Sequence, residues 1–316
     1  MILTVTLNPS LDEWMRLDSL RVGALNRASA VTRYPGGKGI NVARVVRELG
    51  GRTRALAFAG GEDGAILEGL VSRLGIPHTF MPLVGSTRNN YKIRTAQPLG
   101  LTEINTTGPR VSASDLRRMT QRLLARTPAP ACVVLSGSLP PGAPASVYRR
   151  WIAALKRRRI PAVLDTSGAA LREGLAAAPW LIKPNRQEAE ELLRCRLGDV
   201  EHIARAARRL LARGPEVVII SLGADGALLA CAASPGPGTW LASPPLVLAD
   251  SAVGAGDALV GGFVTGWSRR LGVLEAFRLG VACGTASAMT PGTELCHRAE
   301  VRRLLRRVTL QRLRLI

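Results

Sequence analysis

The turn at residues 253–258 has residue types and spacing that suit anion binding and proton transfer. It reads Val-Gly-Ala-Gly-Asp-Ala and directly precedes a long helical pattern. The two glycines allow several backbone N–H groups to point at one spot where the helix begins, and the helix dipole favours an anion there. Asp257 could take a proton from a hydroxyl while these amides hold the charge of a transferring phosphoryl group. An ordinary N-capped helix explains the same letters when the turn is considered alone.

A second glycine-rich turn, Pro35-Gly-Gly-Lys-Gly-Ile-Asn41, also precedes a helical pattern. It is not a P-loop, because Thr32 stands where that motif needs its first glycine and Gly39 follows the lysine in place of Ser or Thr. Bare backbone, the ammonium of Lys38 and the amide of Asn41 suit a polyhydroxylated, phosphorylated ligand. A loop that joins a strand to a helix is the simpler alternative.

Three further segments follow predicted strands. In Leu181-Ile-Lys-Pro-Asn-Arg-Gln-Glu188, Asn185 and Glu188 share one face of a first helical turn, where they could hold a hydrated magnesium ion. A plain helix cap with an acidic third position explains the same spacing. Glycine turns at 136–142 and 221–226 would lie at the carboxyl edge of a parallel sheet, where open α/β sheets bind ligands.

Strand patterns alternate with helical patterns along nearly the whole chain, which predicts one α/β domain over residues 1–316. Apolar strands between amphipathic helices indicate a doubly wound, mostly parallel sheet covered on both faces. The predicted strands are Ile2 to Leu7, Ala55 to Ala59, Cys132 to Ser136, Ala162 to Asp165, Trp180 to Lys183, Val217 to Ser221 and Ala227 to Cys231. The last third is predicted to be mainly helical.

Two segments, at about 12–34 and 77–105, interrupt this alternation. Both contain short polar and apolar alternations, such as Asn90 to Thr95, that suit half-exposed antiparallel strands. We expect them to form a small sheet that makes a lid over one end of the main domain.

The chain carries 43 basic and 23 acidic residues, a net charge of +20 that attracts anions. Of the basic residues, only Lys38, Lys92, Lys156 and Lys183 are lysines. Lysine offers a compact point charge that arginine cannot copy at a tight phosphate site. Three of the lysines fall in candidate site motifs, and Lys156 lies in a basic run.

Composition excludes several classes of protein. Five scattered cysteines predict neither a disulfide framework nor a zinc site. No apolar run approaches the roughly 20 residues that cross a bilayer, and the N-terminal run Met1 to Leu7 resembles a strand rather than a signal peptide. We therefore expect a cytoplasmic protein without a membrane partner.

A nucleic-acid or polyanion binder is the rival class, since basic runs occur at 157–159, 302–307 and 312–314. Aromatic residues are sparse there and no recognition motif is present. Arginine-rich coding is the simpler explanation, so no specific nucleic acid is expected.

Together the motifs resemble the ribokinase-like (PfkB) carbohydrate kinase superfamily, in its branch of 1-phosphofructokinases and tagatose-6-phosphate kinases. The resemblance covers nearly the whole chain, and its motifs occur in order at 6–12, 36–44, 87–92, 102–105, 136–140, 165–168, 183–185, 221–223 and 254–257. It implies a three-layer α/β core with a small β-sheet lid, the cofactors ATP and Mg²⁺, and a lid surface that can serve a homodimer.

The resemblance also implies a role for each matching position. The catalytic group is Asp257 as base, with an anion hole made by the amides of Gly254, Ala255 and Gly256. The implied binding residues for the phosphosugar are Asp12, Gly37, Lys38, Asn41, Arg88, Asn90, Lys92, Asn105 and Ser138. Those implied for the nucleotide are Lys183, Asn185, Glu188, Ser221, Gly223 and Gly226, with magnesium held by Asn185 and Glu188 through water.

Within this branch the motifs at 87–92 and 102–105 are similar to those of the fructose-1-phosphate enzymes. The favoured reaction is therefore ATP with D-fructose 1-phosphate giving D-fructose 1,6-bisphosphate. Tagatose 6-phosphate and fructose 6-phosphate stay open as substrates, and so does a nucleoside or ribose kinase, although Lys38, Arg88 and Lys92 favour a phosphorylated acceptor. Ser251 and Ala252 replace the residues that often precede the catalytic turn in this superfamily, so the presence of a monovalent-cation site stays open.

Overall fold

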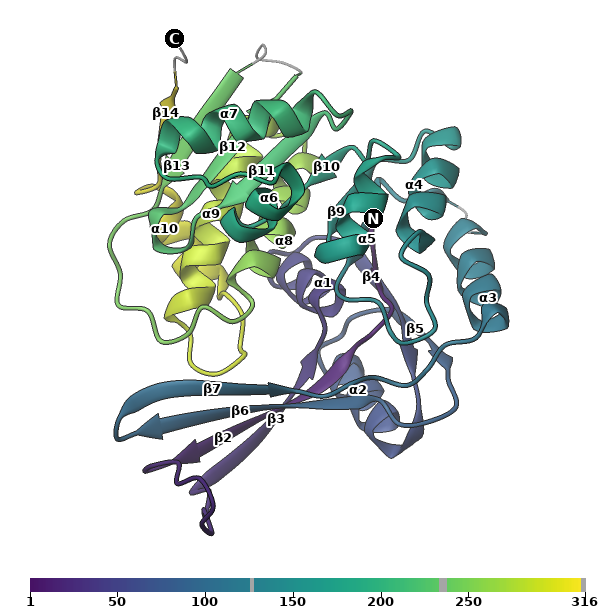
Figure 1. Cartoon of the computed structure of the whole chain (residues 1–316), viewed down its shortest axis with the longest axis vertical. Helices are drawn as coiled ribbons and strands as arrows, with labels where there is room; N and C mark the ends of the chain where they lie inside the picture. Colours follow the sequence, from purple (N-terminus) through teal and green to yellow (C-terminus); the bar gives the residue numbers. More distant parts are fainter. Residues whose placement is uncertain (126–127, 233–237, 314–316) are drawn as a thin grey trace.

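The computed structural model describes residues 1–125, 128–232 and 238–313. Arg314, in the basic run at 312–314, lies outside them. The described chain forms a large sheet with helices on both faces and a smaller sheet that extends from one end (Figure 1).

Within the described residues, the main sheet has ten strands in the order β14-β13-β12-β11-β10-β9-β8-β1-β4-β5. Their bounds, in that order, are Thr309–Arg312, Gly238–Ser243, Ala227–Cys231, Val217–Ser221, Leu181–Ile182, Ala162–Asp165, Cys132–Ser136, Ile2–Thr6, Thr53–Ala59 and His78–Pro82. The strands from β11 to β5 are parallel, and β12, β13 and β14 are antiparallel additions at one edge. This confirms the predicted mostly parallel sheet.

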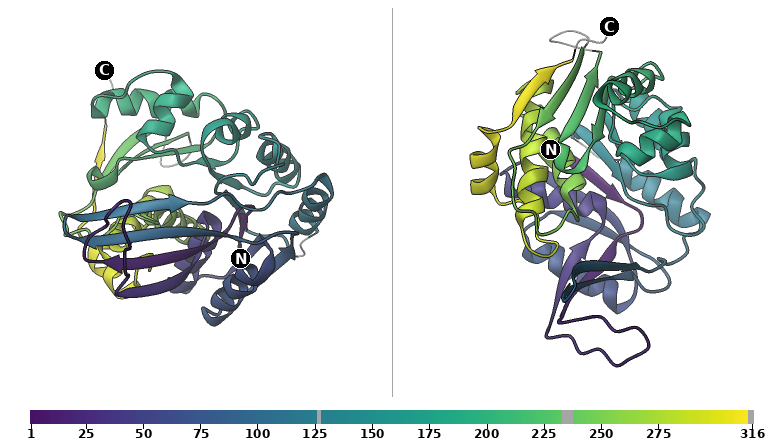
Figure 2. Two further views of the ribbon diagram at one scale, coloured as in Figure 1. Left: turned by 60° about the horizontal axis from the view of Figure 1, so that its bottom comes forward. Right: turned by 60° about the vertical axis from the view of Figure 1, so that its left-hand side comes forward.

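Helices cover both faces of this sheet, so the predicted three-layer core is confirmed (Figure 2). One face packs against α3 (Ala113–Leu124), α4 (Val147–Arg157), α5 (Gly168–Leu175), α6 (Arg186–Leu193) and α7 (Val200–Leu211). The other packs against α1 (Lys38–Glu48), α2 (Gly61–Arg73), α8 (Ala255–Ser268), α9 (Val273–Met289) and α10 (Arg298–Leu305). β1 lies inside the sheet, and all its residues are buried because its side chains pack into the hydrophobic cores on both faces.

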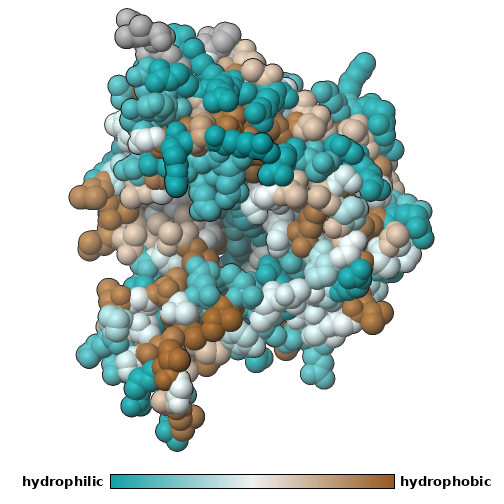
Figure 3. Space-filling model, in the orientation of Figure 1, coloured by the Kyte–Doolittle hydropathy of each residue, from teal (hydrophilic) through white to brown (hydrophobic). Residues whose placement is uncertain are grey.

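The described residues also form a four-stranded sheet, the lid, in the order β3-β2-β6-β7. Its strands are β3 (Ala30–Gly36), β2 (Ser10–Leu17), β6 (Arg88–Ala96) and β7 (Leu99–Asn105). β2 and β6 are parallel and the outer pairs are antiparallel. The space-filling view shows a hollow between the lid and the main domain (Figure 3).

The predicted lid boundary was wrong at β5. Residues 78–82 were assigned to the lid, but β5 is an edge strand of the main sheet and pairs in parallel with β4. An edge strand is half exposed, which gives it the same mixed pattern as a lid strand. β13 and β14 were also missed, since the predicted strands end at Cys231 and the last third was predicted to be mainly helical.

In the described part of the chain, no helix is long and apolar enough to cross a membrane.

Candidate active site

The two glycine-rich turns meet at the carboxyl edge of the main sheet. Gly254 is the N-cap of α8 with a φ of 79°, and Gly37 is the N-cap of α1 with a φ of 115°. Both angles favour glycine. Asn41, in the first turn of α1, donates from Nδ2 to Oδ2 of Asp257 in the first turn of α8 at 2.8 Å. Two helix N-termini therefore converge where the catalytic base was predicted.

Asp257 is buried, with only 6% of its surface exposed. Burial raises the pKa of Asp257 to about 6; the Lys38 ammonium lowers it and the Asp165 carboxylate raises it further. A general base works best when its pKa lies near the working pH. Asp257 therefore combines a position beside the helix amides with a basicity suited to accept a hydroxyl proton.

Lys38 and Lys183 share one carboxylate beside this turn. Their ammonium groups lie 3.0 and 3.4 Å from Oδ1 of Asp165, whose side chain is fully buried. Burial disfavours the charge of Asp165, but the two lysines lower its pKa below the usual value. Burial likewise opposes the charge of Lys38, but Asp165 and Asp257 raise the pKa of its ammonium.

The lysine pair also lies close to the predicted anion hole. A Cβ placed on Gly256 would be 3.4 Å from Nζ of Lys183. The two lysines thus place ammonium groups near the start of α8, where backbone amides already favour an anion. Asp165 belongs to the motif at 165–168, but no role was predicted for it. Its place at the end of the otherwise apolar strand β9 was the available signal.

Asp12 lies on the lid face that turns toward the main domain. Its Oδ1 accepts hydrogen bonds from Oγ of Ser10 at 2.7 Å and from Nδ2 of Asn90 at 3.1 Å. A Cβ on Gly36 would collide with this carboxylate, so the glycine there gives Asp12 its space. The lid thus presents a buried, oriented carboxylate that can accept from sugar hydroxyls.

Arg88 and Ser138 approach each other through Asn8. The Arg88 guanidinium donates to the carbonyl oxygen of Asn8 at 3.2 and 3.3 Å and to Oδ1 of Asn90 at 3.3 Å. Asn8 in turn donates from Nδ2 to Oγ of Ser138 at 3.2 Å. These contacts join the lid to the ends of β1 and β8, which supports a common anion pocket. Asn8 was not predicted, although it belongs to the motif at 6–12.

Lys92 and Asn105 lie on the lid strands β6 and β7. Lys92 is 4% exposed, and its ammonium contacts Oε2 of Glu103 at 2.9 Å, on the neighbouring strand β7. It lies four residues beyond Arg88 on β6, about 13 Å along the strand. Asn105 is opposite Asn90 in the ladder but is exposed. Lys92 therefore holds two lid strands together in this structure.

The nucleotide-side residues lie at the ends of β10 and β11. Asn185 and Glu188 form a capping box: Asn185 Oδ1 accepts from the Glu188 amide, and Glu188 Oε2 accepts from the Asn185 amide, both at 2.8 Å. Asn185 also forms a bridge with Ser221. Gly223 faces open space, whereas a Cβ on Gly226 would collide with the backbone of Ala242. Gly226 therefore has a packing role.

These residues fit a magnesium ion held mainly by other oxygens. Both the cap oxygens of Asn185 and Glu188 are engaged, and the described residues contain no group of three His, Cys, Asp or Glu side chains able to hold a metal. Mg²⁺ commonly keeps several waters and binds substrate phosphates with one or two carboxylates. Glu188 has a second oxygen for such a contact through water.

The segment before the catalytic turn contacts the lid. Arg94 on β6 donates to the carbonyl oxygen of Asp250 at 3.1 Å and to its Oδ1 at 3.3 Å. The Ser251 hydroxyl accepts from the Val253 amide at 3.1 Å. Asp250 is thereby engaged by an arginine from the lid.

Known proteins resemble this chain over nearly its whole length. A model of the pfkB family carbohydrate kinases matches residues 5–300. The 1-phosphofructokinase of Bacillus subtilis is 37% identical over 99% of this chain and 100% of its own length. The 6-phosphofructokinase isozyme 2 of Mycobacterium tuberculosis is 37% identical over 96% of this chain and 88% of its own.

A solved structure extends the likeness to the fold. Phosphofructokinase-2 from Escherichia coli, in complex with substrates and products, superposes with a TM-score of 0.91 at 30% identity, covering 96% of this chain and 98% of the other. The family match over residues 5–300 and the shared fold show that the chain belongs to the pfkB family of carbohydrate kinases.

Proposed function

We propose that the protein transfers the terminal phosphoryl group of ATP to a phosphorylated ketohexose, D-fructose 1-phosphate, to give D-fructose 1,6-bisphosphate and ADP. The observation that carries the proposal is the buried carboxylate of Asp257, held by Asn41 at the start of α8. The names of the B. subtilis and E. coli relatives, both 1-phosphofructokinases, support the choice of sugar. ATP is made and used in the cytoplasm, where we place the reaction.

Asp257 accepts the proton of the attacking sugar hydroxyl. The hydroxyl oxygen forms a bond to the γ-phosphorus while the bond from that phosphorus to the β-γ bridging oxygen breaks, and ADP departs with the electron pair. The amides of Gly254 and Gly256 face the negative charge of the group in transfer. The Ala255 amide donates to the carbonyl oxygen of Ala252 at 3.2 Å in this structure, so it joins them only when that bond opens. Lys183, beside Gly256, and Lys38 neutralise the nucleotide oxygens. Such transfer depends mainly on positioning and charge neutralisation.

Asp165 is a positioning residue in this reaction. It contacts both lysine ammonium groups and is fully buried. Without it, the two cations would repel each other and lose their fixed place beside the anion hole. When bound with ATP, magnesium supplies charge neutralisation at the β and γ phosphates, and Glu188 would contact it through water.

The lid recognises the sugar in this proposal. Asp12 accepts from the sugar hydroxyls, with Asn90 orienting it. Arg88 and Ser138, linked by Asn8, take the phosphate already present on the substrate. Lys92 keeps β6 and β7 together through Glu103 and acts on the substrate only indirectly.

Fructose 6-phosphate is the second candidate substrate. The M. tuberculosis relative, named a 6-phosphofructokinase, has the same 37% identity as the B. subtilis 1-phosphofructokinase. One or two contacts can shift preference between such similar sugars.

A coupled ADP-release assay tests the proposal with fructose 1-phosphate, fructose 6-phosphate, tagatose 6-phosphate and free fructose, each with and without magnesium. The expected result is magnesium-dependent turnover with the highest kcat/KM for fructose 1-phosphate. Equal or higher kcat/KM with free fructose would overturn the phosphosugar assignment. Salt-sensitive retention on DNA with no turnover of any sugar would favour the polyanion-binding class.

We further propose that the lid pairs with the lid of a second copy. Val31 and Ile104 are 52% and 50% exposed on the lid face opposite Asp12 and Asn90. Hydrophobic side chains gather on the lid (Figure 3), and one solved form of E. coli phosphofructokinase-2 is described as tetrameric. Light scattering should give a dimer that Val31→Lys weakens and that Val84→Lys, exposed but outside the lid, leaves intact. A monomeric wild type would refute the pairing.

A further inference from the structure

A cavity of about 440 Å³ lies at the edge of the main sheet opposite the active site. It is bordered by residues that directly precede β9, β10 and β11, among them Pro161, Trp180 and Glu216. The end of α4 and the last turn of α8 complete its wall. Small-molecule sites commonly have volumes of about 300–1,000 Å³. No residue assigned to the kinase reaction lines this cavity.

Two tryptophans form an aromatic wall of the cavity. The ring centroids of Trp180 and Trp267 are 4.4 Å apart at an interplanar angle of 44°, and Trp180 also lies 5.9 Å from Phe263. Both tryptophans are only partly buried, so part of each indole remains available at the cavity surface. Exposed faces of fixed aromatic rings suit stacking against another flat ring.

Charged side chains of both signs line the same cavity without pairing. Lys156, Arg159 and Glu216 all contribute to its wall. In the parts of the chain that the structure describes, none of the three forms an ion pair. Two cations and one carboxylate around one space can together bind a ligand that has an anionic end and a hydrogen-bond donor.

The type and conformation of these residues add to the argument. Lys156 is the one lysine of the four that lies outside both the kinase site and the lid, in a chain with 39 arginines. Its compact ammonium suits a phosphate. Arg159 and Ala178, which both line the cavity, have φ angles of 56° and 49°, where glycine is favoured. A long cationic side chain is thus present at a backbone position that would more readily take glycine.

We propose that this cavity is a second ligand site, which binds a phosphomonoester carried on a flat aromatic or heteroaromatic ring. The ring stacks on Trp180 and Trp267, and the phosphate is bound by Lys156 and Arg159. Glu216 accepts a hydrogen bond from a donor on the ring. The ligand would contact the last turn of α8, the helix whose first turn holds Asp257.

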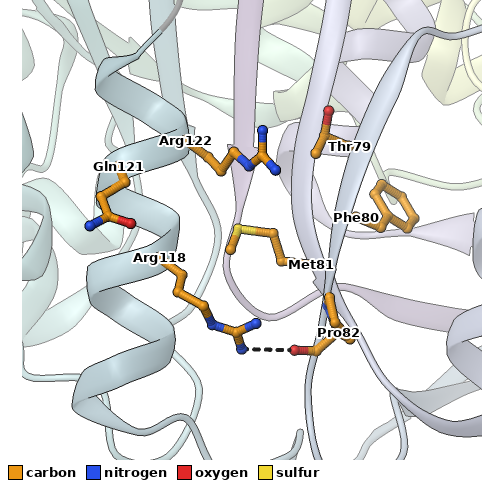
Figure 4. A pocket seen from close by; sticks show the side chains of 7 residues that line it. All are labelled: Thr79, Phe80, Met81, Pro82, Arg118, Gln121 and Arg122. Atoms are coloured by element: carbon orange, nitrogen blue, oxygen red, sulfur yellow. Dashed lines mark hydrogen bonds between the residues drawn. The ribbon is translucent and has the colours of Figure 1, made fainter.

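Another cavity, of about 300 Å³, lies between β5 and α3 (Figure 4). Its lining is less suited to bind a phosphate on an aromatic ring. Its Arg118 already contacts the carbonyl oxygen of Pro82 and the carboxylate of Asp115. The ring of Phe80 points away from the arginines of α3 (Figure 4). The arginine charge there is partly satisfied within the protein, and no aromatic pair forms a wall.

Calorimetric titration of the full chain tests the proposal with 1-naphthyl phosphate as the probe. A saturating non-hydrolysable ATP analogue, magnesium and fructose 1-phosphate occupy the kinase site during the titration. We expect one binding event per chain. Cyclohexyl phosphate, which has the same charge but no flat ring, should bind about tenfold more weakly because it cannot stack on the tryptophans. Equal affinity for the two phosphates would overturn the role of the aromatic wall.

The charge contribution is tested with a matched pair of variants. Lys156→Gln should weaken 1-naphthyl phosphate binding about tenfold or more, the loss expected for one contact to a charged group. Arg157→Gln removes a neighbouring exposed charge that does not line the cavity, and it should change affinity by less than about twofold. Equal weakening by both variants would indicate general attraction to a +20 chain and would refute the site, as would an absence of binding to the wild type.

Discussion

Replacing Asp257 by asparagine should abolish most activity and at the same time stabilise the fold. The pKa of this carboxyl rises from its usual value of about 3.9 to about 6 because the group is buried. A shift of about two units corresponds to about 3 kcal/mol of folding free energy lost above pH 6. Asparagine has the same shape and carries no charge to desolvate. Its side-chain oxygen can still accept the hydrogen bond from Asn41.

The pH dependence follows from the sign of this shift. Below the unfolded-state pKa the carboxyl is protonated in both states, and its contribution to stability is fully present. As the pH rises through the folded-state value of about 6, the buried group must ionise and that contribution is lost. The free energy of unfolding of Asp257→Asn should therefore exceed that of wild type by about 3 kcal/mol at pH 7.5 and by only about 1 kcal/mol at pH 4.5.

Urea unfolding at these two pH values, together with the ADP-release assay, measures both effects. We expect kcat to fall at least about 100-fold, within the usual contribution of a general base. Asp18→Asn, an exposed carboxylate in the segment after β2, is the matched control and should alter neither quantity. Near-normal turnover in the folded Asp257→Asn protein would remove Asp257 from the base role. A variant less stable than wild type at pH 7.5 would refute the argument from burial.

Three other substitutions test the rest of the site. Arg88→Ala should raise KM for the phosphosugar at least about tenfold with a smaller change in kcat, because the charged contacts of Arg88 exist in both ground and transition states. A rise only in KM for ATP would show that the sugar and nucleotide ends of the site are exchanged. Asp165→Ala should lower the free energy of unfolding by about 3 kcal/mol, since it leaves the buried ammonium of Lys183 uncompensated. An unchanged midpoint in urea unfolding would contradict this prediction. Arg94→Ala breaks the contact between lid and main domain at Asp250. This substitution should raise KM for the sugar several-fold and change the free energy of unfolding by less than about 1 kcal/mol. An unaltered KM in steady-state kinetics would show that the contact does not position the lid.

The sequence predicted the elements of the main sheet well, because its strands are continuous apolar runs and its helices have regular periodicity. β1, β8 and β9 are buried along their whole length, as such runs indicate. β5 was misplaced because an edge strand has the mixed polarity of a lid strand. The pattern of polar and apolar residues along a strand does not indicate which sheet the strand joins, since that depends on pairing partners distant in sequence.

In the candidate site, too, the local turns were predicted and the long-range contacts between them were not. The turns at 35–41 and 253–258 were each identified as helix starts, but the bond between Asn41 and Asp257 joins residues 216 positions apart. Only the resemblance to known kinases placed them together. The lysine pair on Asp165 and the bridge through Asn8 were missed, because each depends on loops from several strands meeting at one edge. Lys92 was assigned to the substrate through the family motif at 87–92, and its pairing with Glu103 depends on strand register.

The central claim is that a phosphosugar hydroxyl receives the terminal phosphoryl group of ATP at the start of α8. Phosphorus NMR of a reaction with magnesium, ATP and fructose 1-phosphate tests it most directly. We expect a second sugar phosphomonoester resonance that grows in equal amount with ADP and matches fructose 1,6-bisphosphate. ADP accompanied only by inorganic phosphate, or no ADP at all, would contradict it.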